Sequence, residues 1–175
     1  RLPPPAAASD TVPSMWRGKV AFTRRDTGRH RYVPQVLLWS PGSRRLTTLH
    51  HGAVPAHCPT YGTKPCPRGR VVADVGAIDL GAKVAAMQWD VSASDSPVWD
   101  APESFSEIRA EQLAGHRSTV LTSVAFDHEV CAQDQSVTPS APTVAGPVVF
   151  YAQLIERCFS FRSQLTWNAV RPFAH

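Results

Sequence analysis

One stretch of similar sequence occurs three times at a constant spacing, and this repeat limits the fold more than any other feature. The copies begin at Gly18, Ala82 and Gly146, so their starts are 64 residues apart, twice. Each copy follows a turn-like segment, begins with a small residue and continues into apolar, β-prone residues, as in the sequence GKVAFT of residues 18–23. A regular repeat indicates one structural unit used several times. The spacing of apolar residues is typical of strands and only rarely of helices.

Further strands are expected around each copy. Leading strands are expected at residues 11–16, 71–78 and 142–144. Strands after each copy are expected at residues 35–40, 107–111 and 163–168. Closing strands are expected at residues 45–49 and 118–122, whereas the third unit stops at 171–175 with its closing strand short or missing. Four strands joined as an antiparallel meander and repeated radially make β-propeller blades, so we predict an all-β fold of such blades. A β-sandwich is the alternative, because it also contains many short strands.

The repeat divides the chain into an N-terminal segment and three blade-like units. The segment covers residues 1–17, and the units cover 18–69, 70–135 and 136–175, the last of them incomplete. The repeat is longer than the usual blade because of long connectors. These connectors are rich in Pro, Ser, Ala and Asp and lie at 53–69, 90–105 and 125–139.

The first unit resembles the TolB-type repeat of six-bladed β-propellers. The resemblance is carried by WRGKVAFT at 16–23, QVLLW at 35–39 and PGSRRL at 41–46, while AIDLG at 77–81 is similar to propeller proteins of high-GC bacteria. The Ser-Pro-Asp-Gly turn usual in that repeat is absent, and three units are visible where the family usually has six. The resemblance implies a protein-binding scaffold and supplies no catalytic residues.

Three blades cannot close a ring, and an open end exposes unpaired strand backbone that favours association. We therefore expect that the chain does not exist as a free, closed monomer. Two copies could pair as halves of a ring, with the segment 1–17 or another chain supplying the missing strand. Otherwise the chain is a fragment or a subunit of a larger assembly.

The charge pattern argues against a nucleic-acid partner. The formal net charge is +4, and the small basic clusters at 24–25, 29–31 and 44–45 all lie where turns are expected. A nucleic-acid interface would need one continuous basic face with interleaved aromatic residues. No apolar run approaches the roughly 18 residues of a membrane-spanning helix, so no membrane span is expected. There is no basic-then-apolar leader, so an export signal would already have been removed.

Four cysteines predict disulfides and an extracytoplasmic location, which means a secreted, periplasmic or cell-surface protein. They are Cys58, Cys66, Cys131 and Cys158, and none forms a C-x-x-C pair. A blade places the linker before its first strand and the hairpin after its second strand on one rim, so we expect Cys131 to bond Cys158. Cys58 and Cys66 would staple one loop. The alternative is four unrelated buried thiols.

The same rim would gather a set of polar residues that could bind a ligand. They are His57, Asp127, His128, Glu129, Glu156 and Arg157, with Asp26, Arg29 and His30 at the matching place in the first unit. Their spacing matches no metal motif, so no metal and no cofactor are expected. Trp89 and Trp99 are candidate binding anchors if they are exposed. Trp39 and Trp167 occupy matching repeat positions, which predicts that they pack between neighbouring blades.

No motif predicts catalysis. The chain has no G-x-S-x-G elbow and no phosphate-binding Gly-rich loop, and the carboxylate pairs Asp95–Asp100 and Glu103–Glu107 have no special spacing. We therefore assign no catalytic residue and expect an exported interaction module that binds a protein or cell-envelope partner. The alternative is a hydrolase of sugars or peptides whose carboxylates or histidines lie on the loop rim.

Overall fold

The computed structural model describes residues 8–26, 34–51, 70–94, 103–115, 117–126, 136–157 and 162–173. Throughout these ranges the regular elements are β-strands, and none of them is a helix. The predicted all-β class is therefore confirmed. The described part of the chain also contains no helix with the length and apolar character needed to cross a bilayer.

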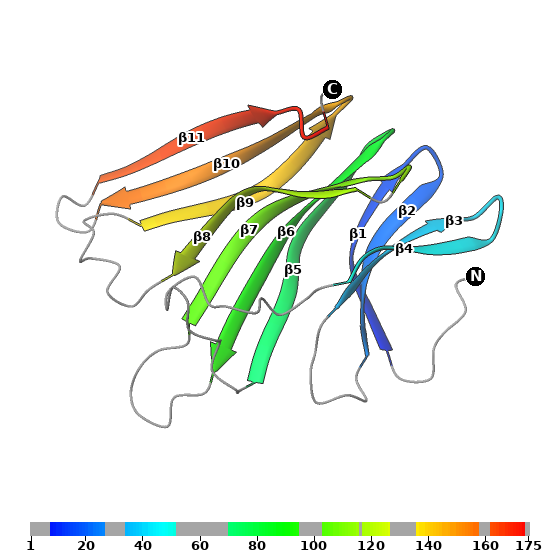
Figure 1. The fold of residues 1–175 in the computed structure, drawn as a ribbon, viewed down its shortest axis with the longest axis horizontal. Coiled ribbons are helices and arrows are strands. Elements are labelled where there is room, and N and C mark those ends of the chain that lie inside the picture. Colours follow the sequence, from blue (N-terminus) through cyan, green and yellow to red (C-terminus); the bar gives the residue numbers. More distant parts are fainter. Residues whose placement is uncertain are drawn as a thin grey trace.

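The strands form three antiparallel sheets that follow one another along the chain (Figure 1). The first sheet has the order β1-β2-β3-β4 and contains β1 (Ala8–Trp16), β2 (Lys19–Asp26), β3 (Gln35–Ser40) and β4 (Arg45–His51). The middle sheet has the order β5-β6-β7-β8 and contains β5 (Arg70–Leu80), β6 (Val84–Ser94), β7 (Glu103–Gln112) and β8 (Ser118–Phe126). The third sheet has the order β11-β10-β9 and contains β9 (Ser136–Ala145), β10 (Val148–Arg157) and β11 (Arg162–Val170). Each sheet is a meander, in which strands that are neighbours in the chain pair with each other.

The repeat predicted these strands well. The leading strands expected at 11–16, 71–78 and 142–144 lie within β1, β5 and β9, and the repeated stretch forms β2, β6 and β10. The described residues of the third unit form three strands, as expected for a unit without its closing strand. Residues 8–16 of the predicted N-terminal segment pair with β2, so they form the first strand of the first sheet and do not close the third.

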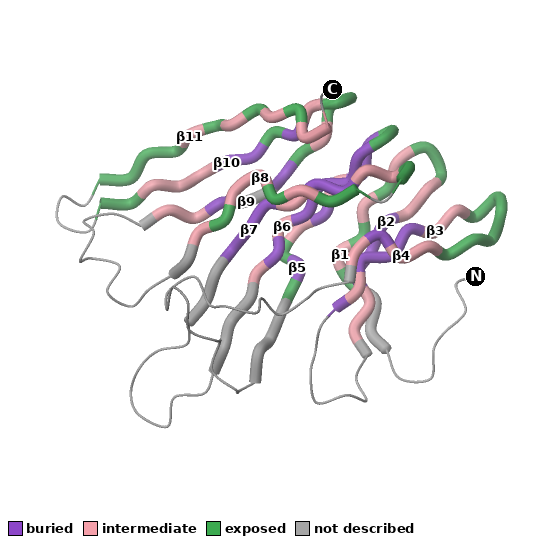
Figure 2. Tube along the Cα trace, viewed as in Figure 1, coloured by how far each residue is buried: buried purple, intermediate pink, exposed green. Residues whose placement is uncertain are grey.

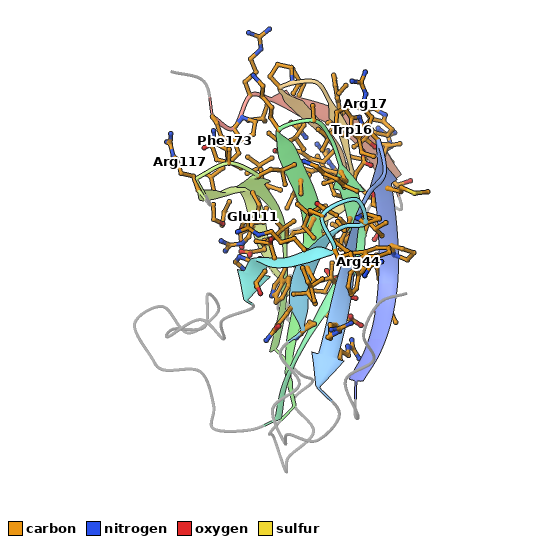
Figure 3. The ribbon with its side chains drawn as sticks, turned by 90° about the vertical axis from the view of Figure 1, so that its right-hand side faces the viewer. Trp16, Arg17, Arg44, Glu111, Arg117 and Phe173 are labelled. Atoms are coloured by element: carbon orange, nitrogen blue, oxygen red, sulfur yellow. The ribbon has the colours of Figure 1, made fainter. Side chains whose placement is uncertain are left out.

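Tight turns join the first two strands of the first and third sheets, and glycine makes both possible. Arg17 and Gly18 both have positive φ angles, 44° and 77°, between the paired residues Trp16 and Lys19. Two-residue hairpin turns with positive φ match the right-handed twist of the flanking strands. In the third sheet Gly146, with a φ of 61°, is the first of the two turn residues between the paired residues Ala145 and Val148. The guanidinium of Arg17 also lies 4.9 Å from the centre of the Trp16 ring (Figure 3).

The middle sheet is covered on both faces. In β6, Ala85, Met87 and Trp89 point toward the first sheet, while Val84 and Ala86 point toward the third. Successive side chains of a strand point to opposite faces, so an unbroken apolar run predicts cover on both sides. Figure 2 shows the resulting buried stretches along the centre of the molecule.

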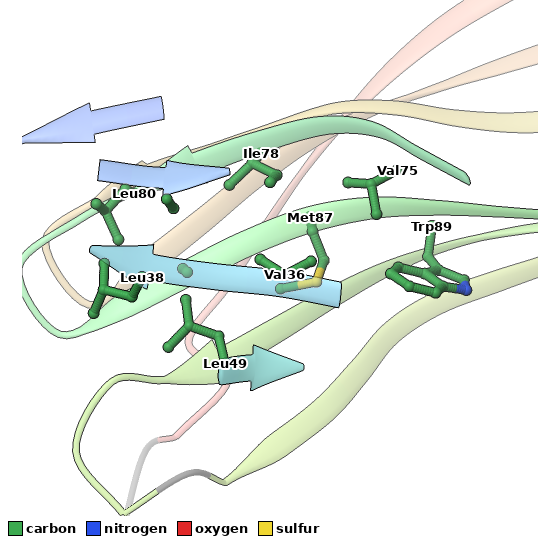
Figure 4. Close-up of a cluster of buried hydrophobic side chains, with 10 residues drawn as sticks. Val36, Leu38, Leu49, Val75, Ile78, Leu80, Met87 and Trp89 are labelled. Atoms are coloured by element: carbon green, nitrogen blue, oxygen red, sulfur yellow. The ribbon is translucent and has the colours of Figure 1, made fainter. Parts of the chain in front are cut away.

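The larger core lies between the first and middle sheets (Figure 4). Its first-sheet members are Ala21, Val36, Leu38 and Leu49, and its middle-sheet members are Val75, Ile78, Leu80, Ala85, Met87 and Trp89. A second cluster joins the middle and third sheets through Val84, Ala86, Ala110 and Val149. Phe173, after β11, packs against this second cluster, and the guanidinium of Arg117 lies 5.9 Å from its ring centre (Figure 3).

One carboxylate links all three sheets. Asp79 of β5 accepts a hydrogen bond from the Ser14 hydroxyl of β1 at 3.3 Å. Its other oxygen accepts the backbone N–H of Val144 of β9 at 2.7 Å. The oxygen that accepts from Ser14 also accepts the backbone N–H of Leu80 at 3.0 Å. Hydrogen bonds to a charged acceptor are stronger than neutral ones, so Asp79 fixes the relative positions of the three first strands.

Beside Asp79, the third sheet approaches the middle sheet so closely that only glycine fits. A Cβ atom on Gly81 would lie 2.5 Å from Cγ1 of Val144 and 3.3 Å from the carbonyl oxygen of Val84. We expect Gly81→Ala to lower the free energy of unfolding by about 1–3 kcal/mol, the usual cost of overpacking. Adding Val144→Ala should recover part of that loss, because it removes the clashing methyl group. Gly42→Ala is the control, because nothing lies within 4 Å of its Cβ position, and its urea midpoint should change little. A Gly81→Ala midpoint equal to that of Gly42→Ala would contradict the close approach.

Candidate functional site

Most of the polar rim predicted from the sequence lies outside the described residues. This holds for His57, Asp127, His128, Glu129, Trp99 and the four cysteines Cys58, Cys66, Cys131 and Cys158. The two disulfides therefore stay predictions. Within the described ranges, no group of three or more His, Cys, Asp or Glu side chains is placed to hold a metal ion.

Glu156 and Arg157 are exposed at the end of β10. Glu156 pairs with Ser163 and Arg157 with Arg162 across the hairpin to β11. Because the two residues are adjacent in a strand, their side chains leave the sheet on opposite faces.

Trp89 is not an exposed binding anchor, and that prediction is wrong. Its side chain is 2% exposed and belongs to the core between the first and middle sheets (Figure 4). The ring of His50 meets the indole edge-on, with 5.3 Å between ring centres. The reason is that the first sheet covers this face of β6. The position of Trp89 beside a long connector in the sequence does not reveal that cover.

The prediction that Trp167 packs between neighbouring sheets is also wrong. Trp167 is 66% exposed, and Trp39 is half-buried. Trp39 lies opposite Val20 across the strand pair, whereas Trp167 lies opposite Ala152. The two strand pairs thus have different registers relative to the hairpin turn. Two residues at matching repeat positions therefore need not point to the same side of their sheets, because a register shift of one residue turns a side chain to the opposite face.

The outer face of the third sheet, turned away from the middle sheet, carries an exposed apolar patch. We call it the third-sheet patch, and it contains Phe150 (37% exposed), Leu165 (57%) and Trp167 (66%). The three share one face because Phe150 is two positions from Ala152 in β10, Ala152 lies opposite Trp167, and Leu165 is two positions from Trp167 in β11. Figure 2 shows β11 exposed or half-buried along its length.

The outer face of the first sheet carries a row of apolar side chains across all four strands. We call it the first-sheet row, and it contains Met15, Val20, Trp39 and Leu46, each directly opposite the next. Met15 is 73% exposed and Leu46 36%, while the two central members are half-buried. This row and the third-sheet patch lie on the two outer faces of the three stacked sheets.

A polar cluster lies between the first and middle sheets. Glu107, Arg109 and Glu111 alternate along β7 and share the face that meets the first sheet. The guanidinium of Arg109 donates to Oε1 of Glu107, with Nε at 2.9 Å and a terminal nitrogen at 2.8 Å. Glu111 is labelled in Figure 3, and its Oε1 lies 2.8 Å from Nδ1 of His50 in β4. Glu107 is thus hydrogen-bonded to Arg109, whereas Oε1 of Glu111 is close to His50 but has no hydrogen-bond partner among the described residues.

This cluster does not have the form of a pair of catalytic carboxylates. Of the carboxylates considered for that role, Asp95, Asp100 and the side chain of Glu103 lie outside the described residues, and Glu107 is occupied by Arg109. Tyr151 of β10 lies on the face of the third sheet that meets the middle sheet, and burial raises the pKa of its phenol above the usual value. No family model, curated protein or solved structure matches this chain.

Proposed function

We propose that this chain is a non-catalytic, exported interaction module, in which three blade-like meanders of TolB type bind a protein or cell-envelope partner through their outer faces. The observation that carries the proposal is the third-sheet patch, where Trp167, Leu165 and Phe150 remain exposed on a sheet whose other face is well packed. Exposed apolar groups gathered on one face mark interaction sites in soluble proteins. Tryptophan in particular is enriched among the residues that dominate binding energy.

The polar cluster supports the same proposal. Glu107 and Glu111 are buried between two sheets, and each is paired with a cationic or polar partner on the same interface. Carboxylates held this way stabilise the junction of the two sheets and are not presented to a substrate. The predicted disulfides and extracytoplasmic location fit a module of this kind and belong to the proposal.

The test places a photoactivatable cross-linker at position 167. A benzophenone amino acid at Trp167 should cross-link a protein in an extract of the source cells, and mass spectrometry should map the cross-link to one segment of it. The same group at Ser123, an exposed position of β8, is the control and should give no such product. Equal labelling from both positions, or none from 167, would contradict the proposed binding face.

A further inference from the structure

The contact between the first and middle sheets and the contact between the middle and third sheets use their sheet faces in the same order. We call each of these two contacts a junction. Counted from the hairpin turn, the third residue of the second strand points to the following sheet, as Ala21 and Ala86 do. The second residue points to the preceding sheet, as Ala85 and Val149 do. We call these faces of each sheet the forward face and the backward face. Both junctions therefore join a forward face to the backward face of the next sheet.

By the same count, one face of each kind is left at the two ends of the stack. Phe150 is the third residue of β10, so the third-sheet patch lies on a forward face. Val20 is the second residue of β2, so the first-sheet row lies on a backward face. The corresponding residues inside the stack are fully covered, with 0% exposure for Ala21, Ala85, Ala86 and Val149, whereas Phe150 is 37% exposed. The third-sheet patch thus lacks the cover that a sheet of the same kind provides within the chain. The outer face of the first sheet is open only along the first-sheet row next to the hairpin turns, because Phe22 and Leu37 on the same face are each 3% exposed.

We infer that the partner is a second copy of this chain, whose first-sheet row packs on the third-sheet patch as the next sheet of the stack. The inference rests on the proposed function, because it names the occupant of the same patch. Phe150, Leu165 and Trp167 of one copy meet Met15, Val20, Trp39 and Leu46 of the other.

Two copies related by a two-fold axis satisfy both open faces at once. Each copy offers one forward and one backward face, so a closed pair contains two identical junctions. A head-to-tail contact makes a ring when its rotation closes and a filament when it does not. We assign the closed pair, because it leaves no apolar outer face uncovered.

Light scattering on the purified chain under non-reducing conditions tests the inference. The chain has a mass of 19.1 kDa, and the expected native mass is twice that value. Trp167→Glu should damage the forward face and Met15→Glu the backward face, and each variant alone should associate at least about 30-fold more weakly. Both side chains are well exposed, so neither substitution disturbs the core. Val120→Glu is the control, because Val120 of β8 is 42% exposed and lies on neither outer face, and it should keep the native mass of the unaltered chain.

Mixing the two damaged variants tests the polarity of the contact. The intact forward face of Met15→Glu can still meet the intact backward face of Trp167→Glu, so the mixture should form a pair with a single junction. A Met15→Glu variant that stays fully paired would show a contact between two third-sheet patches and overturn the head-to-tail arrangement. A ladder of larger masses would overturn the closed pair.

A monomeric chain whose position 167 cross-links a different protein would overturn the second copy as partner and leave the proposed function intact. A monomer without any cross-link at position 167 would overturn both.

Discussion

Replacing Trp89 with alanine is expected to lower the free energy of unfolding by about 3–5 kcal/mol, the usual cost of removing a buried aromatic side chain. The indole is 2% exposed and belongs to the core that joins the first sheet to the middle sheet. Its loss also removes the edge-on contact with His50. Neighbouring strands hold β6 in register on both sides, so the two sheets cannot close up fully around the vacated volume.

Trp167→Ala is the matched control, because it removes the same atoms from a side chain that is 66% exposed. Its effect should stay within about 0.5 kcal/mol, as for most surface substitutions. Urea unfolding followed by circular dichroism measures both variants without depending on tryptophan fluorescence. The protein should be dilute enough that copies are dissociated, because association would add to the apparent stability. Equal losses of stability in the two variants would contradict the burial of Trp89.

The strands of this fold could be predicted from the sequence because their signals are local. The stretch from Gly18 to Thr23 combines a turn glycine with apolar, β-prone residues, and the structure places β2 there. The same signals 64 residues apart located β6 and β10. The three strands among the described residues of the third unit agree with the expectation of a short or missing closing strand. Turn chemistry and alternation are properties of a few neighbouring residues, so one sequence is enough to read them.

Which face of a strand is covered could not be predicted in the same way. Trp89, a candidate anchor if exposed, is buried, and Trp167, expected to pack between sheets, is exposed. Burial depends on which sheets stack and on the register of each strand pair. The contact of Asp79 with Ser14 and Val144 joins residues 65 positions apart in either direction and has no local signal. The pairing of His50 with Glu111 depends likewise on the stacking of the first two sheets.

Removing His50 is expected to destabilise the protein, though less than removing Trp89. His50→Leu should cost about 1–3 kcal/mol, because it leaves a buried carboxyl oxygen of Glu111 without its polar neighbour. Glu111 is 2% exposed, and its Oε1, which lies 2.8 Å from Nδ1 of His50, has no hydrogen-bond partner among the described residues. The double variant His50→Leu/Glu111→Leu should be more stable than His50→Leu alone, because replacing both members of a buried pair by apolar residues is often neutral or stabilising.

The exposed ion pair between Arg25 and Asp74 provides the control for this comparison. Their side chains are 29% and 53% exposed, so solvent screens the pair and Arg25→Leu should cost at most about 1 kcal/mol. The ordering expected in urea unfolding is therefore a clear loss of stability for His50→Leu, partial or full recovery in the double variant, and a smaller loss for Arg25→Leu. A double variant less stable than His50→Leu would mean that Glu111 contributes through packing of its side chain alone. In that case the contact between β4 and β7 would owe its strength to apolar packing around Trp89, and the contact of His50 with Glu111 would add nothing to the junction of the first two sheets.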